Sequence, residues 1–100
     1  MTPEQQAALD RAIAAFPFAE VRQYMARTSW RWGRRGSSRV PDETEMVATV
    51  REIARDGCAS LGGFRVLSTD ATVHVGFGMP NSKKVPRPYW FHEEPVAERK

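Results

Sequence analysis

The side chains that could perform covalent chemistry are few and widely spaced. Nucleophilic catalysis needs a cysteine or serine held beside a histidine base. Cys58 is the single thiol of the chain, and its place on the apolar stripe of a predicted helix favours a small buried side chain. His74 lies on the polar face of a predicted strand and His92 in a proline-rich tail, with no spacing that directs either towards Cys58. We therefore predict that the protein is not an enzyme.

The same residues also make a poor metal or phosphate site. A metal ion would require His74, His92 and either Glu93 or Glu94 to converge, and their spacing matches no common ligand pattern. The sequence Gly76–Gly78 contains a glycine pair, but it lies inside a predicted strand and lacks the third glycine of a phosphate-binding loop. It is more typical of a place where a neighbouring segment packs closely. We predict no metal and no cofactor.

Basic side chains concentrate in one segment. The chain has 15 Lys and Arg against 12 Asp and Glu, for a net charge of +3, yet residues 27–39 contain five arginines and no acidic residue. Trp30 and Trp32 alternate with Arg31 there, which predicts a short strand followed by a glycine- and serine-rich loop. Guanidinium groups beside aromatic rings suit nucleic-acid binding. They equally suit docking onto an acidic protein, or a solvated loop beside two core tryptophans.

A second cluster lies in the tail, residues 80–100. Its run Pro88–Phe91 is too aromatic to remain in solvent, so it either clamps onto the core or anchors a partner. Basic residues just before the run would steer an acidic partner. The predicted partner-binding residues are Arg31, Arg34, Arg35, Arg39, Lys83, Lys84, Arg87 and Trp90.

Two short helices are predicted to begin the domain. Thr2 is suited to be an N-cap, with Pro3 in the first turn and Gln5 completing a capping box. Apolar residues then recur at helical spacing until Pro17, which stops or kinks the helix. A second helical stripe follows from residue 18 to residue 25.

A third helix has the clearest boundaries. Asp42 is a predicted N-cap, and Glu45 three residues later forms the capping box. The apolar stripe consists of Met46, Val47, Val50, Ile53 and Ala54. Gly57 and the pair Gly62-Gly63 are the two alternative ends of this helix.

Strands are predicted at residues 29–32, 64–68 and 72–79, the last with clean alternation of apolar and polar residues. The resulting fold class is α+β: a small three-stranded antiparallel or mixed sheet covered by one main helix, with two short N-terminal helices. We expect one domain over residues 1–79 and a proline-rich C-terminal arm, residues 80–100, that packs on it. A single cysteine and the lack of an apolar run of about 20 residues favour a cytoplasmic protein without membrane contact.

The layout from Tyr24 to Met79 resembles small accessory proteins encoded by tailed bacteriophages. The shared features are Tyr24-Met25, Trp30-Arg31-Trp32-Gly33, Val40-Pro41 leading into the third helix, Gly62-Gly63-Phe64 and the strand from Thr72. The resemblance covers a little over half of the chain, and the arginine-rich loop and aromatic tail depart from it. It carries no catalytic or binding residues over to this chain.

What the resemblance implies is a non-enzymatic inhibitor of host defence, of the anti-CRISPR type, acting in the cytoplasm of the bacterial host. Its partner would be a host protein complex such as a CRISPR–Cas effector. The alternative is a small basic nucleic-acid-binding regulator that contacts DNA or RNA through the arginine loop. A virion structural protein is a third reading. The sequence leaves the target and the oligomeric state open.

Overall fold

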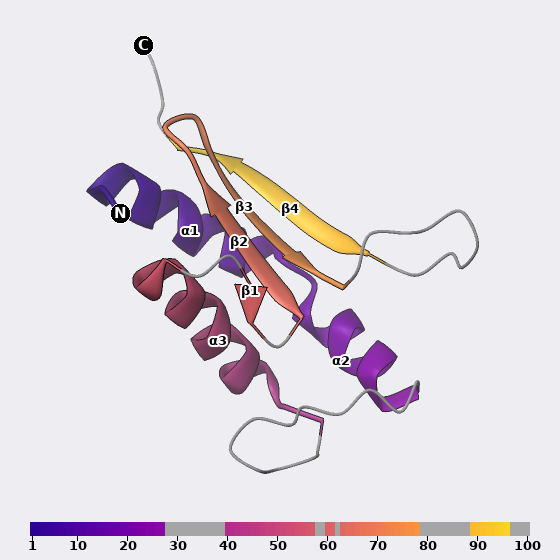
Figure 1. The fold of residues 1–100 in the computed structure, drawn as a ribbon. Helices are drawn as coiled ribbons and strands as arrows, with labels where there is room; N and C mark the ends of the chain where they lie inside the picture. The colour runs from indigo at the N-terminus through magenta and orange to yellow at the C-terminus, as the bar shows by residue number, and fades with distance from the viewer. Residues whose placement is uncertain (28–39, 58–59, 62, 79–88, 97–100) are drawn as a thin grey trace, which may run out of the picture.

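The computed structural model describes residues 1–27, 40–57, 60–61, 63–78 and 89–96. Within these ranges the chain forms the elements shown in Figure 1. They are α1 (Pro3–Ala15), α2 (Phe18–Arg27), α3 (Glu43–Asp56), β1 (Ser60–Leu61), β2 (Phe64–Ser68), β3 (Thr72–Phe77) and β4 (Trp90–Pro95). Among the described residues, none of the helices combines the length and the hydrophobicity of a membrane-spanning segment.

Helices α1 and α2 begin and break where the sequence predicts. The Thr2 hydroxyl accepts a hydrogen bond from the backbone N–H of Gln5 at 3.0 Å, and Gln5 Oε1 accepts one from the backbone N–H of Thr2 at 2.9 Å. Phe16 ends α1 in an extended conformation, as expected for a residue before proline. The break at Pro17 lets Phe16 and Phe18 both enter the core, with ring centroids 4.9 Å apart.

Helix α3 is closed at both ends. Asp42 Oδ1 accepts from the backbone N–H of Glu45 at 2.8 Å, and Glu45 Oε1 accepts from the backbone N–H of Asp42 at 2.9 Å. At the other end Gly57 adopts φ 77°, and its N–H donates to the carbonyl of Ile53. Of the two alternative ends, the helix therefore uses Gly57, because glycine enters the left-handed region without steric cost.

The sheet is antiparallel, in the order β1-β2-β3-β4. Strands β2 and β3 form a hairpin whose turn is organised by Thr69. Its hydroxyl accepts from the backbone N–H groups of Ala71 and Thr72 at 3.1 and 3.0 Å. Side chains alternate between the two faces of each strand, and the inward set Phe64, Val66, Val73, Val75 and Phe77 is buried.

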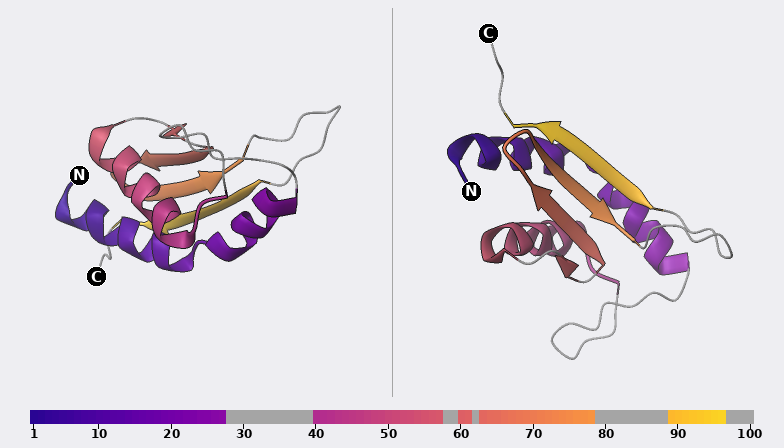
Figure 2. Two further views of the ribbon diagram at one scale, coloured as in Figure 1. Left: turned by 90° about the horizontal axis from the view of Figure 1, so that it is seen from below. Right: turned by 45° about the horizontal axis from the view of Figure 1, so that its top comes forward.

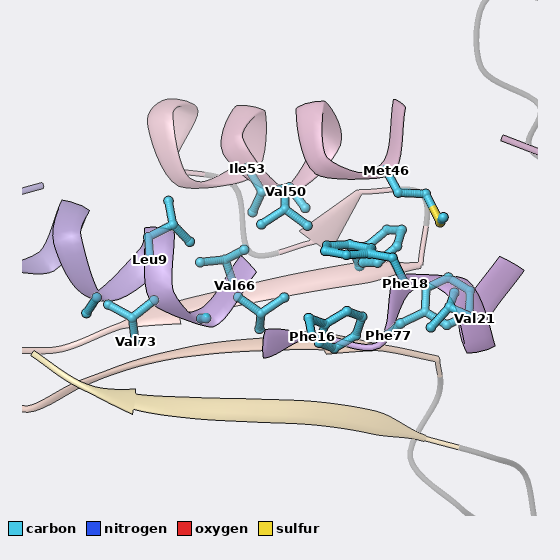
Figure 3. Close-up of a cluster of buried hydrophobic side chains, with 14 of the residues drawn as sticks. Leu9, Phe16, Phe18, Val21, Met46, Val50, Ile53, Val66, Val73 and Phe77 are labelled. Atoms are coloured by element: carbon cyan, nitrogen blue, oxygen red, sulfur yellow. The ribbon is translucent and has the colours of Figure 1, made fainter. Parts of the chain in front are cut away.

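All three helices lie on one side of this sheet (Figures 1 and 2). Helix α1 packs on β3 and β4, and α3 packs on β1 and β2. Figure 3 shows the shared core, in which side chains from α1, α2 and α3 meet the inner face of the hairpin. Phe64 and Phe77 lie at its centre, with ring centroids 4.8 Å apart and no exposed surface.

The α+β class and the antiparallel sheet are confirmed, with three differences in detail. Part of the expected C-terminal arm is strand β4, which pairs with β3 along its whole length. A short strand, β1, lies beyond β2, and α1 covers the sheet together with the expected main helix. The predicted strand at residues 29–32 and its two tryptophans lie outside the described residues, as does Cys58.

Candidate interaction surface

The side of the sheet opposite the helices is not covered by any described element. Two cross-strand rows form it, because residues paired across an antiparallel sheet point to the same face. The register pairs Arg65 with Gly76 and Gly76 with Phe91, and it pairs Leu67 with His74 and His74 with Glu93. We call this surface the open face. Its residues are Arg65, Leu67, His74, Gly76, Tyr89, Phe91 and Glu93.

Aromatic rings dominate one half of the open face. The rings of His74 and Phe91 stack with centroids 4.9 Å apart and planes within 8° of parallel. Tyr89 lies on the other side, its centroid 6.3 Å from that of Phe91. Phe91 is nevertheless 56% exposed, and Leu67 on β2 is 55% exposed. These two are large apolar side chains held in solvent on an ordered strand surface.

Gly76 provides the space in which Tyr89 lies. A Cβ atom at position 76 would be 2.9 Å from the Tyr89 hydroxyl and 3.2 Å from the carbonyl oxygen of Trp90. Glycine in a central strand commonly marks such a close approach. The sequence analysis interpreted Gly76–Gly78 as a place of close packing and not as a phosphate-binding loop. At Gly76 the side chain that packs closely is Tyr89.

Trp90, a predicted partner-binding residue, faces the helices instead. Its ring is half-buried against the core, and its Nε1–H donates to Glu20 Oε1 at 3.2 Å. The ring also meets Tyr24 edge-on, with centroids 5.3 Å apart. Of the run Tyr89-Trp90-Phe91, the middle residue therefore clamps β4 onto α2, while its two neighbours point to the open face. The sequence analysis left two interpretations of this run open, a clamp on the core and an anchor for a partner. Because side chains alternate between the two faces of a strand, Trp90 has the first role, and Tyr89 and Phe91 are free for the second.

The other predicted partner-binding residues lie outside the described ranges. They are Arg31, Arg34, Arg35, Arg39, Lys83, Lys84 and Arg87. The described residues that flank them are informative: α2 ends at Arg27, β3 ends at Phe77 and β4 begins at Trp90. Figure 1 places these three ends at the same end of the molecule.

The two histidines lie on opposite faces of the sheet. His74 belongs to the open face, whereas His92 lies on the helix side, where its Nε2 is 2.9 Å from Glu94 Oε2. This hydrogen bond, followed by one from Arg11, lowers the pKa of the Glu94 carboxyl. Within the described ranges no three His, Cys, Asp or Glu side chains are grouped to hold a metal ion. His92 is thus hydrogen-bonded to Glu94 on the helix side of the sheet, and His74 stacks on Phe91 on the open face.

The sequence analysis did not indicate Leu67, and from the aromatic run it selected Trp90 as the partner-binding residue, whereas Tyr89 and Phe91 are the two that reach the open face. The residues 89–96 lack a clean alternation of apolar and polar types, so the strand was not recognised, and without a strand no face could be assigned. One signal for the additional strand was available in the sequence. The clean alternation of residues 72–77 marks a strand, and a strand that pairs with β2 along one edge has a second edge that can pair with a further strand. No protein-family model, no curated protein and no solved structure matches the chain.

Proposed function

We propose that this protein acts by binding a partner protein through the open face, without catalysing a reaction. We further propose that the partner is a bacterial defence complex, with a CRISPR–Cas effector as the leading candidate, and that binding inhibits it. The observation that supports a binding role is the exposure of Phe91 and Leu67 on the open face. Large apolar side chains on an ordered surface are typical of protein interfaces.

The packing around Phe91 favours a protein partner. Its ring is held between His74 and Tyr89, so it would lose little rotational freedom on binding. Aromatic residues with few rotatable bonds are enriched among the residues that dominate interface energies. With one ring face against His74, Phe91 offers its edge and tip to a partner pocket. An apolar anchor of this kind fits a protein surface better than it fits a polar ligand.

Charge provides a second, longer-range contribution. Arg65 lies in the same cross-strand row as Phe91 but is balanced on the open face by Glu93, so the excess of positive charge comes from the basic residues of segments 27–39 and 83–87. Together they favour approach to an acidic surface and increase the association rate at low salt. A defence effector that carries a nucleic acid presents such a surface.

The proposal is tested with purified CRISPR–Cas effector complexes of several types and a target-DNA cleavage assay. We expect stoichiometric inhibition of one of them by the wild-type protein. Loss of a dominant interface residue costs about 2 kcal/mol, or roughly 30-fold in affinity, so Phe91→Ala should weaken inhibition by that factor. Gln23→Ala, an exposed change on α2, is the matched control. If no complex is inhibited and phage restriction in cells is unchanged, the proposal is wrong.

Single-stranded nucleic acid is a second candidate partner. What favours it is the combination of Arg65 with aromatic rings on the helix-free face of an antiparallel sheet, an arrangement on which bases stack. It predicts binding of a labelled single-stranded oligonucleotide that weakens steeply with salt. Arg65→Ala should reduce the affinity, and changing Arg34 and Arg35 to Glu should abolish binding. Binding that is absent or insensitive to salt excludes this candidate.

A further inference from the structure

Strand β4 forms one edge of the sheet, and its hydrogen-bonding directions follow from its register. The N–H of Val96 donates to the carbonyl of Ala71 at 2.8 Å, so this pair is hydrogen-bonded. Hydrogen-bonded pairs alternate along an antiparallel ladder. With β4 in the observed register, positions 90, 92 and 94 therefore direct their backbone groups to β3. Positions 91, 93 and 95 direct theirs away from the sheet.

One end of this edge is already closed. Pro95 has no N–H to offer, and its carbonyl accepts a hydrogen bond from Arg11 Nη2 at 2.7 Å. A proline with its nitrogen facing outwards is a usual way to end an edge strand. The Arg11 side chain covers the same place. New pairing can therefore not extend past this end of β4.

The middle of the β4 edge, in contrast, has backbone groups available for pairing. Phe91 and Glu93 direct two N–H and two C=O groups outwards, and among the described residues none supplies them with a backbone or side-chain partner. Both residues are exposed, and β4 is the outermost strand on its side in Figure 1 and in the right-hand view of Figure 2. Such an edge is a template for a further strand. Donor and acceptor groups repeat every second residue, which is the spacing of a β-strand.

We propose that a second copy of this chain pairs its own β4 antiparallel with this edge, forming one continuous sheet across a two-fold axis. In the register centred on His92, Phe91 lies opposite Glu93 of the partner subunit. Each residue of the pair donates its N–H to the carbonyl of the other. The symmetric pair does the same, so every free backbone group of both residues is satisfied in both copies.

The edge is complementary to itself, which is why a second copy is the partner that fits it. An isologous contact needs a surface that matches its own image under a two-fold rotation, and the donor and acceptor pattern at Phe91 and Glu93 does. The same register makes the two Phe91 side chains diagonal neighbours on the open face, within reach of each other. The two Glu93 carboxylates are also diagonal neighbours and repel. A short ladder with this opposing charge predicts a weak dimer.

This dimer is independent of the proposed function, although it would join two open faces into one larger surface. Sedimentation equilibrium of the purified protein from low-micromolar to millimolar concentration should show the mass rising towards twice that of the monomer. Glu93→Pro removes an outward N–H without removing a bond to β3, and should leave a folded monomer. Glu93→Ala keeps the N–H, removes the repelling charge and should dimerise more tightly. A monomer at every concentration, or dimerisation of Glu93→Pro at the wild-type concentration, overturns the proposal.

Hydrogen exchange gives a test that needs no substitution. In dilute protein the amides of His92 and Glu94 should be protected by the β3 ladder, while those of Phe91 and Glu93 exchange quickly. At a concentration where nine-tenths of the chains are dimeric, exchange at Phe91 and Glu93 should slow by about tenfold, since only the free tenth exchanges. Exchange at these two amides that is unchanged by concentration contradicts the dimer, whatever happens to Glu93→Pro.

Discussion

Replacing Gly76 by alanine tests whether Tyr89 lies across the centre of the open face. The new Cβ would be 2.9 Å from the Tyr89 hydroxyl, 3.4 Å from its Cζ and 3.2 Å from the carbonyl oxygen of Trp90. The tyrosine ring can swing away, but the carbonyl belongs to β4 and can move only with the strand. Gly76→Ala should therefore displace Tyr89 and strain the pairing of β3 with β4.

The expected cost combines two opposing effects. Overpacking a tight site typically costs about 1–3 kcal/mol. Alanine also restricts the unfolded chain relative to glycine, which offsets about 0.4–1 kcal/mol at a position with ordinary backbone angles. The net loss in the free energy of unfolding should be about 1–2 kcal/mol. For a domain of this size that lowers Tm by about 4–16 °C.

A double-mutant cycle measured by urea unfolding separates the tyrosine from the carbonyl. Tyr89→Ala removes the nearest atom, so Gly76→Ala should cost about 1 kcal/mol less in that background than in the wild type. The remaining cost would report the contact with the Trp90 carbonyl. If Gly76→Ala costs the same in both backgrounds, or stabilises the protein, then Tyr89 does not lie over Gly76 and the described open face is incorrect.

Three further changes test the helix ends and an ion pair. Asp42→Ala should lower the free energy of unfolding by about 1 kcal/mol by removing the cap of α3, and urea denaturation that matches the wild type would contradict this. Gly57→Ala should lower the free energy of unfolding by about 1–2 kcal/mol, because Gly57 has a φ of 77° that an alanine adopts only with strain, even though no atom lies within 4 Å of the new Cβ. A Tm equal to that of the wild type would refute this. Hydrogen bonds from His92 and Arg11 lower the pKa of the Glu94 carboxyl. The ionised carboxylate therefore stabilises the fold fully at pH values above 4.5, its usual pKa, and this stabilisation is lost as the pH falls through the lowered pKa. Glu94→Gln should thus be less stable than the wild type at pH 7 and equally stable in strong acid, and a stability difference independent of pH would exclude this role.

Local signals in the sequence were sufficient to place the helices and the hairpin. Capping at Thr2 and Asp42, the break at Pro17 and the turn at Thr69 each depend on residues within a few positions of one another. Such short-range chemistry is readable without the fold. The clean alternation of β3 in the sequence also agrees with its burial, since its apolar residues Val73, Val75 and Phe77 are all fully buried.

The open face could not be predicted because it depends on a long-range pairing. Strand β4 contains Glu93, Glu94 and Pro95, residues that disfavour a strand by themselves. It becomes one because β3 offers a free edge and because Trp90 and Arg11 fasten it to the helices. Where tertiary contacts decide the structure of a segment, the segment's own composition is a poor guide.

The contacts between the N-terminal helices and β4 have a consequence for how the chain folds. Arg11 reaches Glu94 across 83 positions, and Trp90 reaches Glu20 across 70. During synthesis α1 and α2 therefore emerge long before β4. Part of their apolar surface stays exposed to solvent until β4 has been made and has paired with β3. High sequence separation of this kind slows folding. Nascent chains stalled before Trp90 should remain sensitive to protease, because the contacts of Arg11 and Glu20 with β4 cannot yet form.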